Sequence, residues 1–445
     1  MNAHLSLNTR LVIAAHKAGV RAEADNLVDV LVRVQAPERP AGDTRRRPPY
    51  GIALVVDRSG SMSGRPIEEA RRCSVFVVDG LRADDLVSLT QFDNRVETLV
   101  GAAPRGEGEA LRRAIAGMFA GGNTNLHGGW LAGASGLADL DAATGLRRVV
   151  LLSDGQANEG MVETGAIAAG CREMLARGVT TSTYGLGNNF NEELMVAMAE
   201  AGGGNHYYGD TADDLMEPFK QEFALLGDLC LKNVALTATP REGVEVEMLN
   251  VYQRAEGGGW RLPDVAWNSE AWCVLRLHVP RARGPKAGER LLLASVQVAG
   301  LSLDGEPVSI EQHAIELPVL PAADYEALPK DELVARRLAE LDAATVLSKM
   351  REAAGARDWK AVAEQLTEAE ERFAGNEWVA GVLASMRHLA QAESRERFMK
   401  EAMYSSSKMR ARLSMIGEHL SLAEGDKPAY LRRKLAEGKA EFDDK

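Results

Sequence analysis

Three side chains that carry oxygen donors follow directly on a strongly apolar run in the first quarter of the chain. The segment LVVDRSGSMSG places Asp57, Ser59 and Ser61 at alternate positions. A tight turn can face all three toward one point, and Gly60 and Gly64 permit backbone angles that other residues resist. Carboxylate and hydroxyl oxygens are the ligands that hard cations such as Mg²⁺ prefer. The spacing therefore favours a divalent-metal site.

Two later segments can contribute to the same site. Thr124, in GGNTNL, opens a predicted helix after a glycine-rich turn, and Asp154, in LLSDG, ends a second apolar strand. In an open parallel sheet, ligands bind beyond the carboxyl ends of the strands, where all these residues would meet. Two carboxylates balance a divalent charge and the hydroxyls are neutral, so the ion keeps affinity for a carboxylate from another molecule. We expect Mg²⁺, with Mn²⁺ or Ca²⁺ as alternatives for the same oxygen donors.

The elements that must position these residues alternate between strand and helix. Such an alternation predicts a Rossmann-like α/β fold, a mostly parallel sheet with helices on both faces. Strands are expected at residues 50–57, 85–93, 95–100, 147–155, 179–187 and 205–209, and helices at 66–81, 107–119, 124–140, 163–178, 191–202 and 213–226.

The flanks of this region have a different pattern. Regularly spaced strands are expected at 229–240, 244–252, 258–265, 271–280, 290–300 and 308–319, which is typical of a β-sandwich. Two alternating segments, 5–14 and 26–36, precede a linker rich in Pro and Arg. Because an isolated hairpin is marginally stable, we expect these two strands to complete the sandwich, with the α/β domain inserted in it. An independent N-terminal hairpin is the alternative.

After the sandwich the sequence becomes helical. Segments 332–354, 358–374, 377–393 and 395–416 carry apolar residues at helical spacing, which predicts an all-α domain, either a bundle or a short repeat array. The expected organisation is therefore 1–45 for the N-terminal strands, 48–227 for the α/β domain, 228–320 for the rest of the sandwich and 328–440 for the helices.

Composition limits the classes of partner. The chain has 445 residues, of which 45% are hydrophobic and 26% charged, with a net charge of −12. An acidic protein is not expected to bind nucleic acid or anionic membranes as its main partner. We find no apolar segment long enough to span a bilayer and no export signal. The four widely spaced cysteines are expected to be reduced, and the protein to be cytoplasmic.

At these residues the sequence resembles the von Willebrand factor type A family and its metal-ion-dependent adhesion site. The matching pieces are Asp57-x-Ser59-x-Ser61, Thr124 and Asp154, within residues 48–227. The segments LLSDGQANEG and TNLHGGWLAG also resemble the bacterial, inter-alpha-trypsin-inhibitor-heavy-chain-like branch. The resemblance implies that the serines and the threonine contact the ion, that the aspartates often act through water, and that an Asp or Glu of a partner completes the coordination.

Other interpretations apply to single residues. The D-x-S-x-S segment alone is also explained by a helix-capping turn. Asp93, in TQFDN, is either a turn residue, which we favour, or a side chain that supports the ligands without touching the ion. Asn123 is expected to shape the turn or to give the same support, and His127 is expected to be a solvent-facing or capping residue.

The sequence predicts a non-enzymatic, metal-dependent protein-binding module or scaffold, and it leaves self-association open. One alternative is a metal-dependent phosphohydrolase. Phosphatases of the haloacid-dehalogenase type need D-x-D, whereas Ser59 stands at the second acidic position here. The P-loop and nucleophile-elbow motifs are also absent from the sequence. An accessory subunit of an ATPase machine is a second alternative, and an exported adhesin is disfavoured by the N-terminal sequence.

Overall fold

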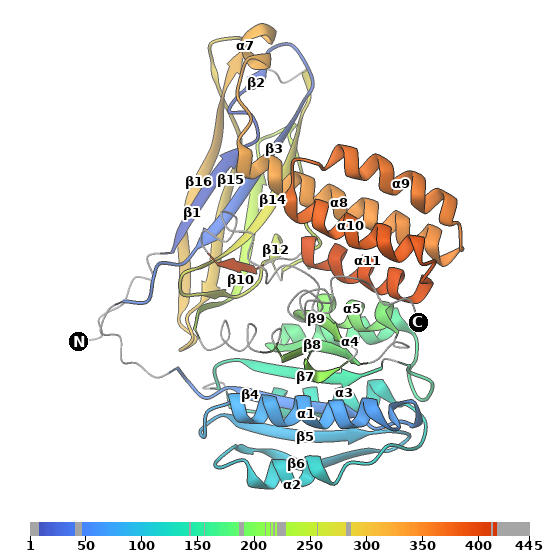
Figure 1. Cartoon of the computed structure of the whole chain (residues 1–445). Coiled ribbons are helices and arrows are strands. Elements are labelled where there is room, and N and C mark those ends of the chain that lie inside the picture. The colour runs from blue at the N-terminus through green and yellow to red at the C-terminus, as the bar shows by residue number, and fades with distance from the viewer. Residues whose placement is uncertain are drawn as a thin grey trace, which may run out of the picture. The chain divides into compact units, whose positions relative to one another are not determined.

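The computed structural model, drawn in Figure 1, describes most of the chain. The described residues are 9–40, 47–141, 144–154, 156–186, 191–209, 211–213, 215–216, 219, 228–255, 257–281, 286–410 and 413–415. They divide into two compact units. The α/β unit comprises the described residues of 45–227 and 388–404, and the β-rich unit comprises those of 1–44, 228–387 and 405–423.

A six-stranded sheet forms the centre of the α/β unit. Its strand order is β6-β5-β4-β7-β8-β9. β6 pairs antiparallel with β5, and all the remaining pairs are parallel. The strands are β4 (Gly51–Asp57), β5 (Leu86–Phe92), β6 (Val96–Pro104), β7 (Arg147–Ser153), β8 (Val179–Leu186) and β9 (Gly203–Gly209). The helices are η1 (Gly60–Met62), α1 (Arg65–Gly80), α2 (Glu109–Ala116), α3 (Leu126–Ala138), α4 (Thr164–Ala176) and α5 (Glu192–Ala201). The predicted α/β fold is confirmed; most of the helix expected at 213–226 lies outside the described residues.

Both faces of the central strand are buried, as its continuous apolar sequence requires. Every residue of β4 is buried. Ala53 and Val55 pack on one face with Trp130 and other side chains of α3, α4 and α5. The alternate residues, including Leu54, are equally buried toward the opposite face, and α1 also contacts β4. The strand is therefore a rigid support for whatever follows Asp57.

The β-rich unit contains two sheets around one core. One sheet has the order β1-β3-β14-β11 with β17 beside β14, and the other has the order β12-β10-β15-β16-β2 with β13 beside β10. The strands before the α/β unit are β1 (Arg10–Ala15), β2 (Val20–Arg21) and β3 (Asn26–Gln35). The strands after it are β10 (Leu229–Pro240), β11 (Glu245–Met248), β12 (Trp260–Arg261), β13 (Val265–Ala266), β14 (Ser269–Val279), β15 (Arg290–Leu301), β16 (Pro307–Leu320) and β17 (Leu413–Met415). Antiparallel pairing of β3 with β14 joins the two flanks of the α/β unit in one sheet.

Strand β17 corrects one expectation. The sequence pattern predicts a helix through residue 416, but α11 ends at Arg410 and residues Leu413–Met415 form a strand. On the side of β14 opposite β3, β11 pairs only from Leu275 onward, which leaves backbone groups near Ser269 open. Segment 413–415 pairs with them. Buried backbone groups need such partners, and a sequence pattern cannot show where an open strand edge will be.

Helices follow the sheets in sequence. They are α7 (Ala322–Glu326), α8 (Glu332–Gly355), α9 (Trp359–Arg372), α10 (Glu377–Gln391) and α11 (Arg395–Arg410). Val334 and Leu341 of α8 pack against Leu31, Trp272 and Val274 on the β1-β3-β14-β11 sheet. Within the described ranges, no helix is long and apolar enough to cross a membrane.

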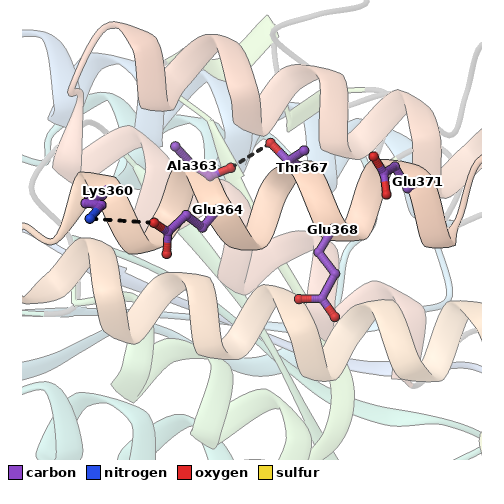
Figure 2. A pocket seen from close by; sticks show the side chains of 6 residues that line it. All are labelled: Lys360, Ala363, Glu364, Thr367, Glu368 and Glu371. Atoms are coloured by element: carbon purple, nitrogen blue, oxygen red, sulfur yellow. Dashed lines mark hydrogen bonds and ion pairs between the residues drawn. The ribbon is translucent and has the colours of Figure 1, made fainter.

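One face of α9 is polar and open, as Figure 2 shows. It lines a shallow hollow with Lys360, Glu364 and Thr367, among other residues. Lys360 pairs with Glu364 at 3.9 Å, and the Thr367 hydroxyl donates to the Ala363 carbonyl at 3.0 Å and accepts from the Arg387 guanidinium of α10 at 3.0 Å. The first two contacts are the i,i+4 contacts of a solvated helix face.

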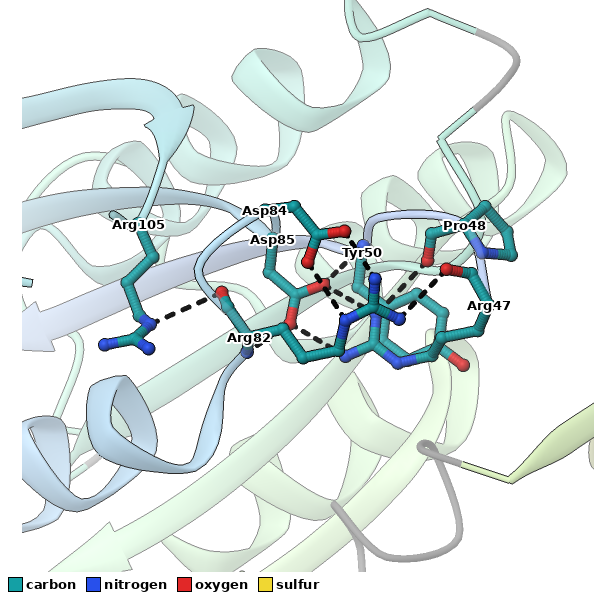
Figure 3. A network of polar contacts seen from close by, with 7 residues as sticks. All are labelled: Arg47, Pro48, Tyr50, Arg82, Asp84, Asp85 and Arg105. Carbon is teal, nitrogen blue, oxygen red and sulfur yellow. Dashed lines mark hydrogen bonds and ion pairs between the residues drawn. The ribbon is translucent and has the colours of Figure 1, made fainter. Parts of the chain in front are cut away.

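A buried carboxylate fastens the start of the central strand (Figure 3). Both oxygens of Asp85 accept from the Arg47 guanidinium, at 2.6 and 2.7 Å. The backbone N–H groups of Tyr50 and Arg82 donate to the same carboxylate at 2.9 and 2.8 Å. Arg47 also stacks on the Tyr50 ring, 3.6 Å from its centroid. Asp85 thus joins the entry to β4 with the entry to β5.

We expect Asp85→Ala to destabilise the protein by about 3–5 kcal/mol, because it leaves the Arg47 charge and two backbone donors without their buried acceptor. Asp84→Ala is the matched control. Asp84 pairs with Arg82 at the surface, where ion pairs contribute about 1 kcal/mol or less. Urea unfolding of the three proteins measures the difference, and similar midpoints for Asp85→Ala and Asp84→Ala would contradict the structural role of Asp85.

Candidate metal centre

The five predicted ligands stand on three loops at one edge of the sheet. Asp57 is the last residue of β4, and Asp154 directly follows β7, the parallel neighbour of β4. Ser59 and Ser61 occupy the connection after β4, with Ser61 in η1, and Thr124 lies on the loop before α3. Four of the five side chains are buried, whereas Ser61 is exposed. The set therefore consists of four buried side chains and one solvent-facing hydroxyl.

Asp57 is the most constrained member of the set. The Ser59 N–H donates to Oδ1 at 2.8 Å, and the Ser153 hydroxyl donates to Oδ2 at 2.5 Å. Burial, followed by the negative charge of Asp154, raises the pKa of Asp57 to about 6, although both hydrogen bonds act in the opposite direction. The two carboxylates are therefore close enough to repel each other. Ser153 was not predicted from the sequence; its position beside Asp154 in LLSDG is the signal that could have revealed it.

Backbone hydrogen bonds tie the loop after β4 to the loop before α3. The Gly60 N–H donates to the Gly122 carbonyl at 2.9 Å, and the Gly121 N–H donates to the Arg58 carbonyl at 2.7 Å. The Arg58 N–H in turn donates to the Phe92 carbonyl at the end of β5, at 2.8 Å. The loop that carries Ser59 and Ser61 is thus held on both sides.

Thr124 is fastened to the third loop through its backbone. Its carbonyl accepts from the N–H groups of Asn158 and Glu159 at 3.1 and 3.2 Å, and its own N–H donates to the Asn158 side chain at 2.8 Å. Since the backbone supplies these contacts, the hydroxyl is not needed to hold the loop.

The glycines act differently from the sequence expectation. Gly64 has the predicted left-handed backbone, with φ of +76°, but Gly60 does not, so the expectation for Gly60 was wrong. A Cβ at Gly60 would instead lie 3.3 Å from the Gly122 carbonyl, which makes Gly60 a close-approach position. Gly122, on the loop before α3, is a left-handed glycine that was not predicted, with φ of +79°, and a Cβ there would collide with Asn94 at 2.5 Å.

The helix-capping interpretation of the serines is wrong. Ser59 precedes η1 without a side-chain capping bond, and α1 begins after Gly64. The hydroxyls of Ser59 and Ser61 instead lie 3.1 Å apart. Two adjacent hydroxyls that do not cap a helix are in a suitable arrangement to share a ligand.

The remaining candidate residues have structural contacts. The Asp93 carboxylate pairs with Arg58 at 2.7 Å and accepts from the Arg95 N–H at 2.7 Å, as a turn residue that also braces the loop after β4. Asn123 is exposed on the loop before α3. His127, on α3, packs 5.9 Å from the Trp130 ring, and burial lowers the pKa of its imidazole. Trp130, three residues later on the same helix face, covers part of the His127 ring, and the side chain is half-buried.

The donor set fits a small divalent cation. All five side chains offer oxygen, which suits Mg²⁺, and two repelling carboxylates leave negative charge to be neutralised. Arg58, between Asp57 and Ser59 in sequence, is engaged with Asp93. In the described part of the chain no three His, Cys, Asp or Glu side chains gather to hold a metal, so a set of two carboxylates and three hydroxyls is a distinct kind of candidate.

Comparisons with known proteins agree with this fold. Residues 51–221 match the model of the von Willebrand factor type A domain, so the chain carries such a domain. An uncharacterized protein, sll0103, of Synechocystis is 28% identical over 204 residues, which are 44% of this chain and 46% of that protein. Human inter-alpha-trypsin inhibitor heavy chain H3 is 28% identical over 219 residues, 46% of this chain and 23% of that protein. The matches therefore span less than half of each relative.

Two solved structures share the fold over most of the chain. A von Willebrand factor type A protein from Catenulispora acidiphila has a TM-score of 0.68 at 16% identity, covering 92% of this chain and 98% of that one. The ArnB paralog VWA2 from Sulfolobus acidocaldarius has a TM-score of 0.57 at 17% identity, covering 90% and 99%. Von Willebrand factor type A domains commonly bind a divalent metal and typically mediate protein–protein interaction.

We expect Asp57→Asn to raise the melting temperature of chelator-treated protein by several degrees at neutral pH. Above a pKa of about 6 the folded chain carries a charged Asp57 that burial and Asp154 disfavour, whereas the unfolded chain hydrates it. Lowering the pH through 6 protonates Asp57 in the folded chain first, so the folded parent gains stability and the advantage of asparagine shrinks.

Differential scanning calorimetry at several pH values between 5 and 8 tests this expectation. Excess Mg²⁺ should remove the advantage of Asp57→Asn, because the bound ion then neutralises the carboxylates of the parent protein. A lower melting temperature for Asp57→Asn than for the parent in chelator at neutral pH would contradict it.

Proposed function

We propose that the α/β unit is a non-enzymatic, metal-dependent protein-binding module. It binds Mg²⁺, with Mn²⁺ or Ca²⁺ as substitutes, through Asp57, Ser59, Ser61, Thr124 and Asp154. It captures an acidic side chain of a protein partner. The observation that carries the proposal is the state of Asp57, a buried carboxylate whose pKa is raised by burial and by Asp154 at an edge where three loops are tied together.

Each group has a separate part in this proposal. The aspartates balance the charge of the ion, and the Ser153 hydroxyl and the Ser59 N–H hold Asp57 in place. The hydroxyl ligands add no charge, so the bound ion would offer a net attraction to an outside carboxylate. Ser61 is the solvent-facing hydroxyl of the set and marks the side from which a partner approaches.

The rest of the chain is proposed to present this module. We infer a β-sandwich interrupted by residues 48–227, followed by a helical domain that comprises α7 to α11 in the described part of the chain and ends before β17. Pairing of β3 with β14, and of β2 with β16, supports the interrupted sandwich. A cytoplasmic location is part of the proposal. It is supported by four cysteines that are all buried and free, and cell fractionation tests it.

Direct ion binding separates the proposed ligands from their neighbours. We expect Ser61→Ala to weaken Mg²⁺ binding about tenfold, since it removes one neutral oxygen from the set. Ser63→Ala is the matched control, because Ser63 is also exposed, lies two residues away and is not in the proposed set. Isothermal titration of Mg²⁺ into each protein measures the difference. Equal affinities for the parent and Ser61→Ala would remove Ser61 from the site.

Partner capture tests the function itself. We expect affinity purification to recover a partner in Mg²⁺ but not in chelator, and Thr124→Ala to reduce recovery severalfold with an unchanged melting temperature, since the Thr124 backbone supplies the loop contacts. In parallel, the protein is incubated with p-nitrophenyl phosphate. Phosphate release that is lost in Asp57→Ala would support the phosphohydrolase instead, and equal capture by Thr124→Ala and parent would count against the binding module.

A further inference from the structure

Exposed apolar side chains stand on the loops of the candidate metal centre. Eight large apolar side chains are prominently exposed among the described residues: Leu27, Val96, Phe119, Leu131, Met161, Val162, Val251 and Leu292. Scattered exposed residues of this kind are ordinary. Three of the eight, however, stand on the two loops that carry Thr124 and follow Asp154. We refer to Phe119, Met161 and Val162 as the apolar rim.

Phe119 is exposed on a segment that is held in place. Its side chain is 67% exposed. The Arg58 guanidinium donates to the Phe119 carbonyl at 3.4 Å, and the Arg71 guanidinium donates to the Met118 carbonyl. Arg71 also lies 5.4 Å from the centre of the Phe119 ring. An aromatic side chain on a fixed backbone loses little conformational entropy when a partner covers it.

Met161 and Val162 stand on the loop between Asp154 and α4, and they are 42% and 49% exposed. The loop is fastened before them, where the Glu159 N–H donates to the Thr124 carbonyl at 3.2 Å. It is fastened after them, where the Glu163 carboxylate caps α4 by accepting from the Gly165 N–H at 2.9 Å. The loop therefore holds both side chains in exposed positions, where they do not contribute to the packing of the core.

The geometry points to a partner segment in which the acidic residue has apolar neighbours on both sides. The apolar neighbours pack on the apolar rim while the acidic side chain enters the metal centre. This inference rests on the proposed function and deepens it, because it adds a sequence preference to the requirement for an acid. Well-packed apolar contacts around a polar anchor are the usual source of affinity at an interface.

Short synthetic peptides on a sensor surface test the preference with the full chain in excess Mg²⁺. They carry a central Glu flanked on both sides by Leu or Phe, by Ser or by Lys, and each has a twin with a central Gln. We expect apolar flanks to bind about tenfold tighter than Ser flanks, the effect of burying one apolar side chain. The variants Phe119→Ser and Met161→Ser should reduce the preference to about twofold while Glu remains preferred over Gln. Leu292→Ser, whose parent side chain is 44% exposed in the β-rich unit, should leave it unchanged.

The outcomes separate the two claims. Magnesium-dependent binding of every Glu peptide regardless of its flanks, or an unchanged preference in Phe119→Ser and Met161→Ser, overturns the apolar rim and leaves the metal-dependent function standing. If no Glu peptide binds in Mg²⁺, or if Gln twins bind equally well, the proposed function fails and the preference fails with it.

Discussion

The central interaction in this molecule is the repulsion between two carboxylates at the ends of adjacent buried strands. Asp57 and Asp154 follow β4 and β7, and parallel pairing of these strands forces their side chains to the same edge. Burial and mutual repulsion raise the pKa of Asp57 to about 6, even with Ser59 and Ser153 donating to it. Two buried, repelling carboxylates lower the stability of a folded chain unless a positive charge lies close to them. A bound cation would supply that charge.

The scaffold supplies the stiffness that this arrangement needs. At one end of the central strands, the buried Asp85 carboxylate binds Arg47 and the backbone of Tyr50. At the other end, backbone hydrogen bonds join the three candidate ligand loops, and Thr124 takes part through its own main-chain groups, which bond to the backbone and the side chain of Asn158. The Thr124 hydroxyl is thereby not needed to hold its loop. A site built this way holds its ligands in place before an ion or partner arrives.

The sequence allowed the α/β fold and the five candidate residues to be predicted, because both depend on local patterns. Continuous apolar strands such as LVV before Asp57 predict a buried parallel sheet, and D-x-S-x-S with Thr124 and Asp154 places oxygens at one edge. Ser153, Gly122 and β17 were missed, because each depends on a distant neighbour. Ser153 matters through Asp57, Gly122 through its approach to Asn94, and β17 through the open edge of β14. Contacts between distant segments leave no periodic signal in a single chain.

A crystal structure of the protein grown in Mn²⁺ tests the central claim most directly, because anomalous scattering locates the ion without assumptions about its ligands. The prediction is one strong anomalous peak within coordinating distance of oxygens from the loop after β4, from Thr124 and from the end of β7, directly or through water. The opposite result is a well-ordered map in which Asp57 and Asp154 contact only protein groups and solvent, with no anomalous signal between them.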